Sequence, residues 1–563
     1  MVVKVTEKRL ITAALPYVNN IPHLGHIVGS HLPGDIFARF CRLKGYDTLY
    51  IGGTDEHGTP ALLEAKKQKI PLDKFCTTIY KEHKKIYDWF NISYDNFSRT
   101  SKPIHHELTQ EFFQKIKDNG YIKEAKIKQF YCEQDKIFLP DRFVEGTCKS
   151  CGYEHARGDQ CEKCTKILDT LTLINAKCTL CSNTPEIKES NHLFLKYDKL
   201  SSKLETWLKK QTHWRPQVLN LALAWVKEGI KERGITRDIE NGVKVPLEGF
   251  EDKVFYVWFD APIGYISSTK EHTKNWESYW KEDSKIYHFI GKDNIPFHSI
   301  FWPSSLIANG EYNLPYNVVG LQYLNYEGGK FSKTHKRGVF CENIPKTGIN
   351  PDVLRAYLTF VIPETDDTEF KWSEFESRVN SDLIGNFGNF INRTLTFAHS
   401  KLNGEITQPK DLEEYSEFNQ QVLEKINKVE ELLEKAELRH AFQEILSLSD
   451  LGNKFFNDQE PWVVLKQDEN KAREILYICS DLCRKLAILS SPYIPQSSEK
   501  IFNILNLKEN PTKQAIWETS KEIKIPKKHK INKPEVLFEK LTPEFVEEFK
   551  KTVAETSDLK DLF

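Results

Sequence analysis

The sequence lacks any apolar run near the roughly 20 residues that a membrane-spanning helix requires. The longest candidate near the N-terminus, residues 11–18, is short and contains Pro16. We find no targeting segment and no anchor in this pattern. A membrane-embedded protein is therefore excluded, and we expect a cytoplasmic protein with no membrane partner.

An excess of charge of one sign is also lacking. Lys and Arg number 79 and Asp and Glu number 80, which gives a net charge of −1. A protein that attracts nucleic acid through its overall field is excluded, so any polyanion would have to be held by local basic surface. At 563 residues, with 39% hydrophobic and 28% charged residues, the chain is typical of a globular protein with three or four packed units.

Cysteine is scarce outside one segment. Of the 12 cysteines, six lie between Cys148 and Cys181. This density is too low for a disulfide scaffold, and the clustering indicates metal binding in a reducing compartment.

The cluster contains hooks of the CxxC type, in which two thiolates can hold one ion. Two hooks spaced for a single structural zinc ion with four thiolate ligands are formed by Cys148, Cys151, Cys161 and Cys164. A third hook, Cys178 and Cys181, follows, and a CxxD pair, Cys132 and Asp135, precedes the first two. This outer pair predicts either a second zinc site with three sulfurs and one carboxylate or a vestigial hook, and metal analysis distinguishes the two.

The N-terminal pattern predicts a parallel α/β sheet. Residues 10–14 form an apolar strand, a loop and a helix follow, and residues 48–51 form the next strand. Further strands are expected at 254–259, 286–290 and 316–321. Polar residues follow these runs, as expected where ligands bind at the carboxyl ends of parallel strands.

The C-terminal third has a helical pattern. Apolar residues with three-and-four spacing run from Val422 to Phe442 among many Glu and Lys residues. This spacing predicts one amphipathic helix over 422–442 within a helical bundle.

Two short motifs carry chemistry. His23 and His26 lie on one face of the first turn of a helix that follows the first strand, where free backbone N–H groups favour a phosphate, and Gly25 permits close approach of a nucleotide. Far downstream, Lys330, Ser332 and Lys333 follow a glycine pair and suit a polyphosphate. Each motif alone is weak, since two ordinary histidines or lysines would look the same.

Together these motifs resemble the signatures of the class I aminoacyl-tRNA synthetases, and within them the methionyl-tRNA synthetase family. The second signature departs mildly from the family, with Phe331 and Thr334 where Met and Ser are frequent. Further matching segments are ALPYVNN at 14–20, GGTDEHGT at 52–59, FLPDRFVEGTC at 138–148, ITRD at 235–238, VFYVWFDAPIGY at 254–265, GKDNIPFHS at 291–299 and NFGNFINR at 386–393.

The resemblance implies an architecture in consecutive parts. A Rossmann-type catalytic domain is expected over 1–121 and 236–325, split by a zinc-containing insertion over 122–235. A linker subdomain that carries the KFSKT loop would follow over 326–385, then a helical anticodon-binding bundle over 386–545 and a tail over 546–563.

The resemblance also implies the activity and the residues that perform it. The enzyme would activate methionine with ATP and Mg²⁺ and transfer it to tRNA(Met), including the initiator tRNA. Catalysis would fall to His23, His26, Lys330 and Lys333, with Gly25 and Ser332 also at the ATP. Asp55 would pair with the substrate ammonium, and the side-chain pocket would be lined by Ala14, Leu15, Tyr17, Trp258, Ala261, Pro262, Tyr265, Phe297, His298 and Trp302. Asn389, Arg393 and Trp462 would read the anticodon.

Two rival interpretations remain at this point. A class I synthetase for Leu, Ile or Val would share both signatures, but the stretch between His26 and Lys330 leaves too little room for its large editing domain. A non-catalytic zinc-ribbon RNA-binding protein, or an inactive paralogue, would not need intact signature residues. Because the chain ends soon after the bundle, at Phe563, we expect a monomer.

Overall fold

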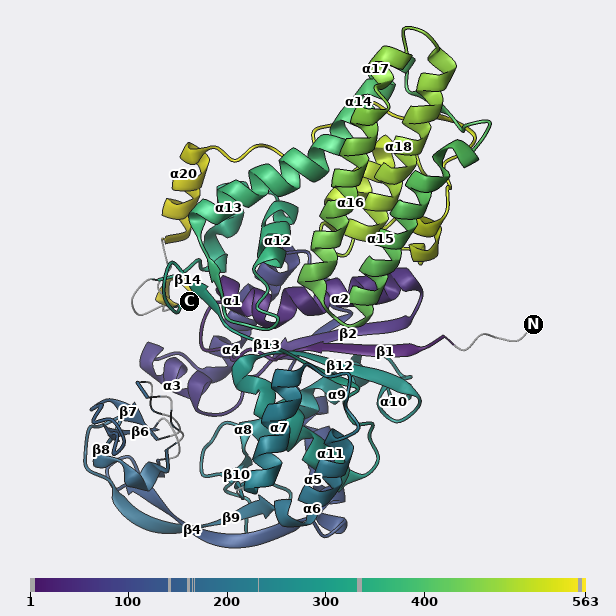
Figure 1. The fold of residues 1–563 in the computed structure, drawn as a ribbon. Coiled ribbons are helices and arrows are strands. Elements are labelled where there is room, and N and C mark those ends of the chain that lie inside the picture. The colour runs from purple at the N-terminus through teal and green to yellow at the C-terminus, as the bar shows by residue number, and fades with distance from the viewer. Residues whose placement is uncertain are drawn as a thin grey trace.

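A five-stranded parallel sheet lies at the middle of the molecule (Figure 1). The computed structural model describes residues 6–139, 143–158, 161, 163, 164, 166, 168–230, 232–331, 337–554 and 559–563. The strand order is β13-β12-β1-β2-β3. The strands are β1 (Lys8–Ala13), β2 (Asp47–Thr54), β3 (Asn96–Arg99), β12 (Ser284–Gly291) and β13 (Asn317–Leu321).

Both faces of this sheet are buried, which explains why its strands are nearly continuous apolar runs. Ile11 of β1 lies in one core with Phe37 of α2 (Leu32–Lys44), while its neighbour Leu10 lies in a second core with Phe112 of α5 (Pro103–Asp118). Successive strand residues therefore face opposite helical layers. The prediction of a parallel α/β sheet is confirmed.

The helices on the two faces come from both halves of the sheet. Between β1 and β3 the chain forms α1 (Leu24–His26), the π-helical turn η1 (Ile27–His31), α2, α3 (Thr59–Gln68) and α4 (Leu72–Trp89). The second half contributes α8 (Val257–Asp260), α9 (Ile263–His272), α10 (Glu277–Trp280), η5 (Phe297–Phe301) and α11 (Trp302–Asn309).

One predicted strand is wrong. Residues 254–259 do not join the parallel sheet: Val254–Phe255 form the short antiparallel strand β11, paired with β10 (Thr236–Arg237), and helix α8 begins at Val257. Val254, Phe255, Val257 and Phe259 are buried, whereas Tyr256 and Trp258 are half-buried. A short apolar run of this kind cannot be identified as strand or helix from its periodicity alone.

The insertion forms an arm on one side of the sheet (Figure 1). Its backbone is the long antiparallel pair of β4 (Ile122–Cys132) and β9 (Glu186–Leu195), and the cysteine-rich tip contains a second small sheet. The tip strands are β5 (Ile137–Phe138), β6 (Val144–Thr147), β7 (Ala156–Arg157) and β8 (Ile174–Cys178). Helices α6 (Tyr197–Leu208) and α7 (Pro216–Glu228) return the chain to the sheet.

The C-terminal bundle lies on the other side (Figure 1). It follows the short strands β14 (Leu324–Tyr326) and β15 (Thr368–Phe370), the turn η6 (Cys341–Thr347) and helix α12 (Pro351–Phe360). Its main helices are α13 (Trp372–Arg378), η7 (Val379–Gly388), α14 (Asn389–Leu402), α15 (Ser416–Glu434), α16 (Leu438–Asp458), α17 (Pro461–Val464), α18 (Glu469–Ser490) and α19 (Pro495–Ile504). Strands β16 (Glu405–Thr407) and β17 (Lys528–Lys530) pair beside it, and α20 (Pro543–Ala554) packs against η6.

The single helix predicted over 422–442 is also wrong, because the chain forms two helices there. Helix α15 ends at Glu434 and α16 begins at Leu438, with Ala436 at φ 56° in the turn. Ala436 is buried, so the apolar spacing continues through the turn and hides it in the sequence. In the described part of the chain, no helix is long and apolar enough to cross a membrane.

Candidate active site

The strand order reverses direction at β1, whose two neighbours are β2 and β12. In open parallel sheets, ligands bind outside the carboxyl ends of the strands at this kind of switch point. The chain leaves β1 here: the Ala14 N–H donates to Phe289 O (3.0 Å), and the Asp55 N–H, at the end of β2, donates to Pro16 O (2.9 Å). The first signature and the acidic segment are therefore held side by side.

His23 and His26 cap the helix that follows. The Gly25 N–H donates to His23 Nδ1 (3.0 Å), and the His23 N–H donates to His26 Nδ1 (3.1 Å), which is a reciprocal capping box. Each neutral ring accepts through Nδ1 and so carries its proton on Nε2. The local fold thus leaves two Nε2–H donors, on rings whose centroids lie 3.9 Å apart.

The protonation of His23 agrees with this assignment. Burial, and then the neighbouring charge of His26, lowers the pKa of His23 well below its usual value, so the ring is neutral near pH 7. Gly25 has a local role that the sequence did not reveal. A Cβ at this position would lie 2.8 Å from His23 Cε1, so only glycine leaves room for the capping imidazole.

The start of the second signature reaches this pair. The ring of Phe331 stacks on His23 with centroids 4.6 Å apart and an angle of 11° between the ring planes. Its neighbour Lys330 is exposed, with its ammonium 5.2 Å from the Tyr323 ring centre. Ser332, Lys333 and Thr334 lie outside the described residues. The structure therefore joins the first signature to Phe331, and the predicted roles of Ser332 and Lys333 stay predictions.

Asp55 is a buried acid at the floor of the site. Its side chain is 4% exposed, and among the described residues its carboxylate accepts one hydrogen bond, from the His57 N–H (3.2 Å). Burial and the nearby charge of Asp260 raise the pKa of Asp55 well above its usual value. A carboxyl group in this environment gains a compensating partner when a cation binds.

A stack of aromatic rings stands near the same strand ends. Trp258 and Phe297 lie face to face with centroids 3.5 Å apart, and Tyr17 meets Trp258 edge-on at 6.4 Å. Leu15 lies against α9, since a Cβ on Gly264 would be 3.1 Å from its Cδ2. Ala261 and Pro262 precede that helix and Tyr265 lies within it. The structure therefore brings Tyr17, Trp258 and Phe297 together and places Leu15 against the helix that carries Tyr265.

Tyr265 and His298 form a hydrogen-bonded pair with a defined direction. His298 Nδ1 lies 3.1 Å from Asn294 O, which can only accept, so Nδ1 carries the ring proton. His298 Nε2 therefore accepts from the Tyr265 hydroxyl (2.9 Å). Burial lowers the pKa of His298 to about 4, which keeps the ring neutral. In this arrangement the Tyr265 hydroxyl donates to His298, and the His298 N–H donates to the backbone oxygen of Asn294.

Trp302 differs from the other predicted lining residues. Its ring packs against Phe112 in the core beneath the sheet, with centroids 5.9 Å apart. Its buried indole N–H has no hydrogen-bond partner within the described ranges. The same core contains Tyr265, and Leu15 and Phe297 pack against it.

The cysteine hooks form two separate clusters, each with ligand atoms within 4.8 Å of one another. In the first, Sγ atoms lie 3.9 Å apart for Cys148 and Cys164 and 3.6 Å apart for Cys151 and Cys161. A tetrahedral zinc with Zn–S bonds of about 2.3 Å places its sulfurs about 3.8 Å apart. The first cluster therefore fits a four-thiolate zinc site.

The second cluster consists of the nested outer pair. Asp135 Oδ2 lies 3.1 Å from the sulfurs of both Cys132 and Cys178, and Cys132 Sγ lies 3.4 Å from Cys181 Sγ. Its hook has the same backbone turn as the first: Ser182 at φ 64° follows Cys181 as Gly152 at φ 71° follows Cys151. The left-handed turn after the second cysteine is therefore common to both metal-binding hooks. It could not be recognised in the sequence of the third hook, because Ser182 stands there in place of a glycine.

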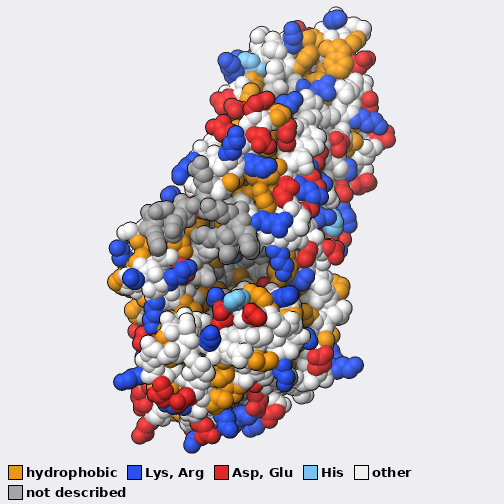
Figure 2. Space-filling model, turned by 90° about the vertical axis from the view of Figure 1, so that its left-hand side faces the viewer, with side chains coloured by type: hydrophobic (Ala, Val, Ile, Leu, Met, Phe, Trp, Pro, Cys, Tyr) orange, Lys and Arg blue, Asp and Glu red, His pale blue; other side chains and the backbone are white. Residues whose placement is uncertain are grey.

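The three residues predicted to read an anticodon also share one surface. Arg393, on α14, lies over the Phe456 ring at 4.3 Å, and Trp462, on α17, packs near the same ring at 6.0 Å. Asn389 lies one turn before Arg393 and donates to Asn453 (3.2 Å). Trp462 is 38% exposed, and hydrophobic side chains gather at the tip of the bundle (Figure 2).

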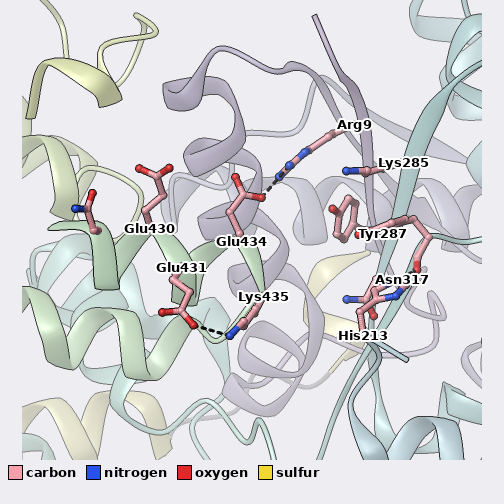
Figure 3. A pocket seen from close by; sticks show the side chains of 11 residues that line it. Arg9, His213, Lys285, Tyr287, Asn317, Glu430, Glu431, Glu434 and Lys435 are labelled. Carbon is pink, nitrogen blue, oxygen red and sulfur yellow. Dashed lines mark hydrogen bonds and ion pairs between the residues drawn. The ribbon is translucent and has the colours of Figure 1, made fainter. Parts of the chain in front are cut away.

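A cavity of about 540 Å³ lies elsewhere, at the opposite edge of the sheet (Figure 3). Arg9 and Lys285, near the amino ends of β1 and β12, face the acidic side chains of α15 across it, and Arg9 donates to Glu434 (2.8 Å). Its wall mixes charges of both signs. The cavity separates the sheet from the bundle and contains none of the predicted site residues.

Comparisons with known proteins agree with both halves of this description. A family model described as "tRNA synthetases class I (M)" matches residues 9–395, and a model for the anticodon binding domain of methionyl tRNA ligase matches residues 408–558. A methionine--tRNA ligase of Borrelia garinii subsp. bavariensis is 45% identical over 88% of this chain and 68% of its own length. Methionine--tRNA ligase 1 of Acaryochloris marina is 42% identical over 96% of this chain and 98% of its own length.

The fold is also similar to a solved structure. The Mycobacterium tuberculosis methionyl-tRNA synthetase in complex with methionyl-adenylate superposes with a TM-score of 0.79 at 23% identity, over 95% of this chain and 100% of that chain. This likeness supports the same architecture for the sheet, the insertion and the bundle.

Proposed function

The chain belongs to the methionyl family of class I aminoacyl-tRNA synthetases, and from this premise we propose that it is a methionine--tRNA ligase. In the first step the methionine carboxylate attacks the α-phosphate of ATP, which forms methionyl-adenylate and releases pyrophosphate. In the second step the methionyl group passes to the 3′-terminal adenosine of tRNA(Met), including the initiator, and AMP leaves. The two outward Nε2–H donors of His23 and His26 are the observation that carries this proposal.

The histidine pair suits the first step. Two neutral N–H donors fixed by a capping box can stabilise the charge that develops on the α-phosphate without reorganising. Lys330, together with Lys333 and Ser332, would hold the outer phosphates, and Gly25 lies between the two rings. Mg²⁺ bound with ATP would neutralise part of the same charge.

The buried acid and the aromatic stack suit methionine. Asp55 would pair with the substrate ammonium, which supplies the cation that its environment lacks. Trp258, Phe297 and Tyr17 offer ring surface to a thioether. Because the Tyr265 hydroxyl donates to His298 and the His298 N–H donates to Asn294 O, the sulfur would be held mainly by aromatic contact. Homocysteine, which lacks only the methyl group on sulfur, is then an expected competitor.

The other parts have supporting roles in the proposal. Zinc in the first cluster, and in the second if two ions bind, would be structural, because four protein ligands leave no open position. Asn389, Arg393 and Trp462 would contact the anticodon. We further propose that the protein acts as a monomer in the cytoplasm.

Amino-acid-dependent exchange of pyrophosphate into ATP, measured across all twenty amino acids, tests the proposal. We expect exchange with methionine and not with Leu, Ile or Val. Absence of exchange with methionine in folded, zinc-containing protein would instead favour a non-catalytic RNA-binding paralogue.

A further inference from the structure

The ring of Phe331 makes a specific contact with the first histidine of the site. It lies nearly parallel to His23, with centroids 4.6 Å apart, and Tyr326 packs near it at 5.6 Å. A Cβ on Gly25 would lie 3.7 Å from Phe331 Cδ2, so the phenyl ring also covers the capping turn. His23 thus has a hydrogen bond on one ring edge and an aromatic plane against one face.

The backbone around Phe331 leaves space for this ring. Gly338 has φ +140°, and a Cβ there would lie 2.4 Å from Phe331 Cδ1. The chain beyond Gly338 runs along the capping turn, because the Leu24 N–H donates to Val339 O (3.1 Å) and the Cys341 N–H donates to Pro22 O (3.0 Å). The contact is therefore part of a built interface between two segments that are distant in the sequence.

We propose that Phe331 is a positioning residue that fixes the plane of the His23 imidazole; this inference rests on the proposed function. The Gly25 N–H holds Nδ1, and the rings of His26 and Phe340 meet His23 at angles of 42° and 83°, so none of these contacts lies flat against the ring to oppose its tilt about that hydrogen bond. A parallel phenyl ring removes the tilt and so fixes the direction of Nε2–H. Donors in an active site act only when they are held within about 0.5 Å and 10–20° of the productive geometry.

The mechanism predicts a kinetic signature. Because the His23 donor acts on charge that develops in the transition state, loss of its orientation lowers kcat and leaves KM for methionine unchanged. Parallel aromatic contacts are worth enough to orient a side chain, and their loss corresponds to about a twofold to twelvefold effect. An aromatic replacement retains the plane, whereas an aliphatic one of similar bulk does not.

Pyrophosphate exchange with F331L, F331Y, H23A and the double variant H23A/F331L tests the proposal. We expect F331L to lower kcat about twofold to twelvefold, with F331Y near the wild type. In the H23A background, F331L should cause no further loss. Phe397→Ala, which truncates a half-buried Phe of α14 in the bundle, is the matched control for lost packing and should exchange normally.

A second variant displaces the ring without removing it. Gly338→Ala introduces a methyl group into the space of Phe331 and should lower kcat in the same way as F331L. Wild-type kcat in F331L, or an equal loss in the presence and absence of His23, would overturn the inference. Lack of methionine-dependent exchange in the wild type would overturn the proposed function instead.

Discussion

The guanidinium of Arg355 lies 2.8 Å from the carboxylate of Asp35, and both side chains are fully buried. Arg355, on α12, also donates to the carbonyls of Phe90, Pro492 and Tyr493. Burial raises the pKa of Asp35, but the charges of Arg39 and Arg355 outweigh it and hold the pKa below its usual value. One cation thus ties the sheet's helical layer to the bundle.

We expect Arg355→Met to be strongly destabilising, because it removes one of the two cations beside the buried Asp35 and leaves three carbonyls lacking their donor. Breaking such a buried pair costs about 3–5 kcal/mol. Urea unfolding measures the loss, and Lys84→Ala, which breaks the exposed pair with Asp88, is a control expected to cost below about 1 kcal/mol. Equal stability of the two variants would contradict the role of Arg355.

We expect the buried Asp55 to lower the stability of the free protein near pH 7 and to favour the binding of methionine. Its folded-state pKa is raised, so its contribution to stability is present at low pH and is lost as the pH rises toward neutrality. Asp55→Asn should therefore unfold at a higher temperature than the wild type at pH 7 without ligand. With excess methionine the difference in unfolding temperature should narrow or change sign, because only the wild type is stabilised by binding methionine.

The raised pKa of Asp55 also determines how methionine binding depends on pH. The ammonium pairs with the ionised carboxylate, so methionine affinity should fall as the pH falls through the raised pKa. Thermal unfolding with and without methionine, from pH 5 to 8, measures both effects. Asp88→Asn, which alters an exposed acid, serves as the control. A methionine-induced shift of equal size in Asp55→Asn would refute the assignment.

The nested cluster predicts two zinc ions per chain. Asp135→Ala should lower the zinc content from two to one, because it removes the oxygen that lies 3.1 Å from two sulfurs. Cys148→Ser should affect the other ion and, since the tip has few apolar residues, unfold the tip. Elemental analysis of pure protein checks the counts. One zinc in the wild type would show that the third hook is vestigial.

Whether a feature could be predicted from the sequence depends on how far apart in the sequence its interacting residues lie. The strand at 10–14 and the CxxC hooks are local patterns, and the structure has both. The turn at Ala436 was missed because this buried alanine continues the apolar spacing, and helix α8 was missed because a short apolar run has no period that identifies an element. The HxxH spacing did contain a signal for the capping box, which sequence reasoning attributed wholly to phosphate binding. The stack of Phe331 on His23 joins residues too far apart for any local pattern to reveal.

The surface at the tip of the bundle separates recognition of tRNA from chemistry. Trp462 is 38% exposed and is held against Phe456, beside Arg393, far along the bundle from the histidine pair (Figure 1). Stacking of an unpaired base on an aromatic ring is worth about 1–3 kcal/mol. Trp462→Ala should therefore lower kcat/KM for tRNA charging by about fivefold to 150-fold and leave pyrophosphate exchange nearly unchanged. Trp462→Phe, which keeps a ring, should recover most of the charging. Because exchange needs no tRNA, parallel loss of both activities in Trp462→Ala would mean that the residue supports the fold and does not bind the anticodon.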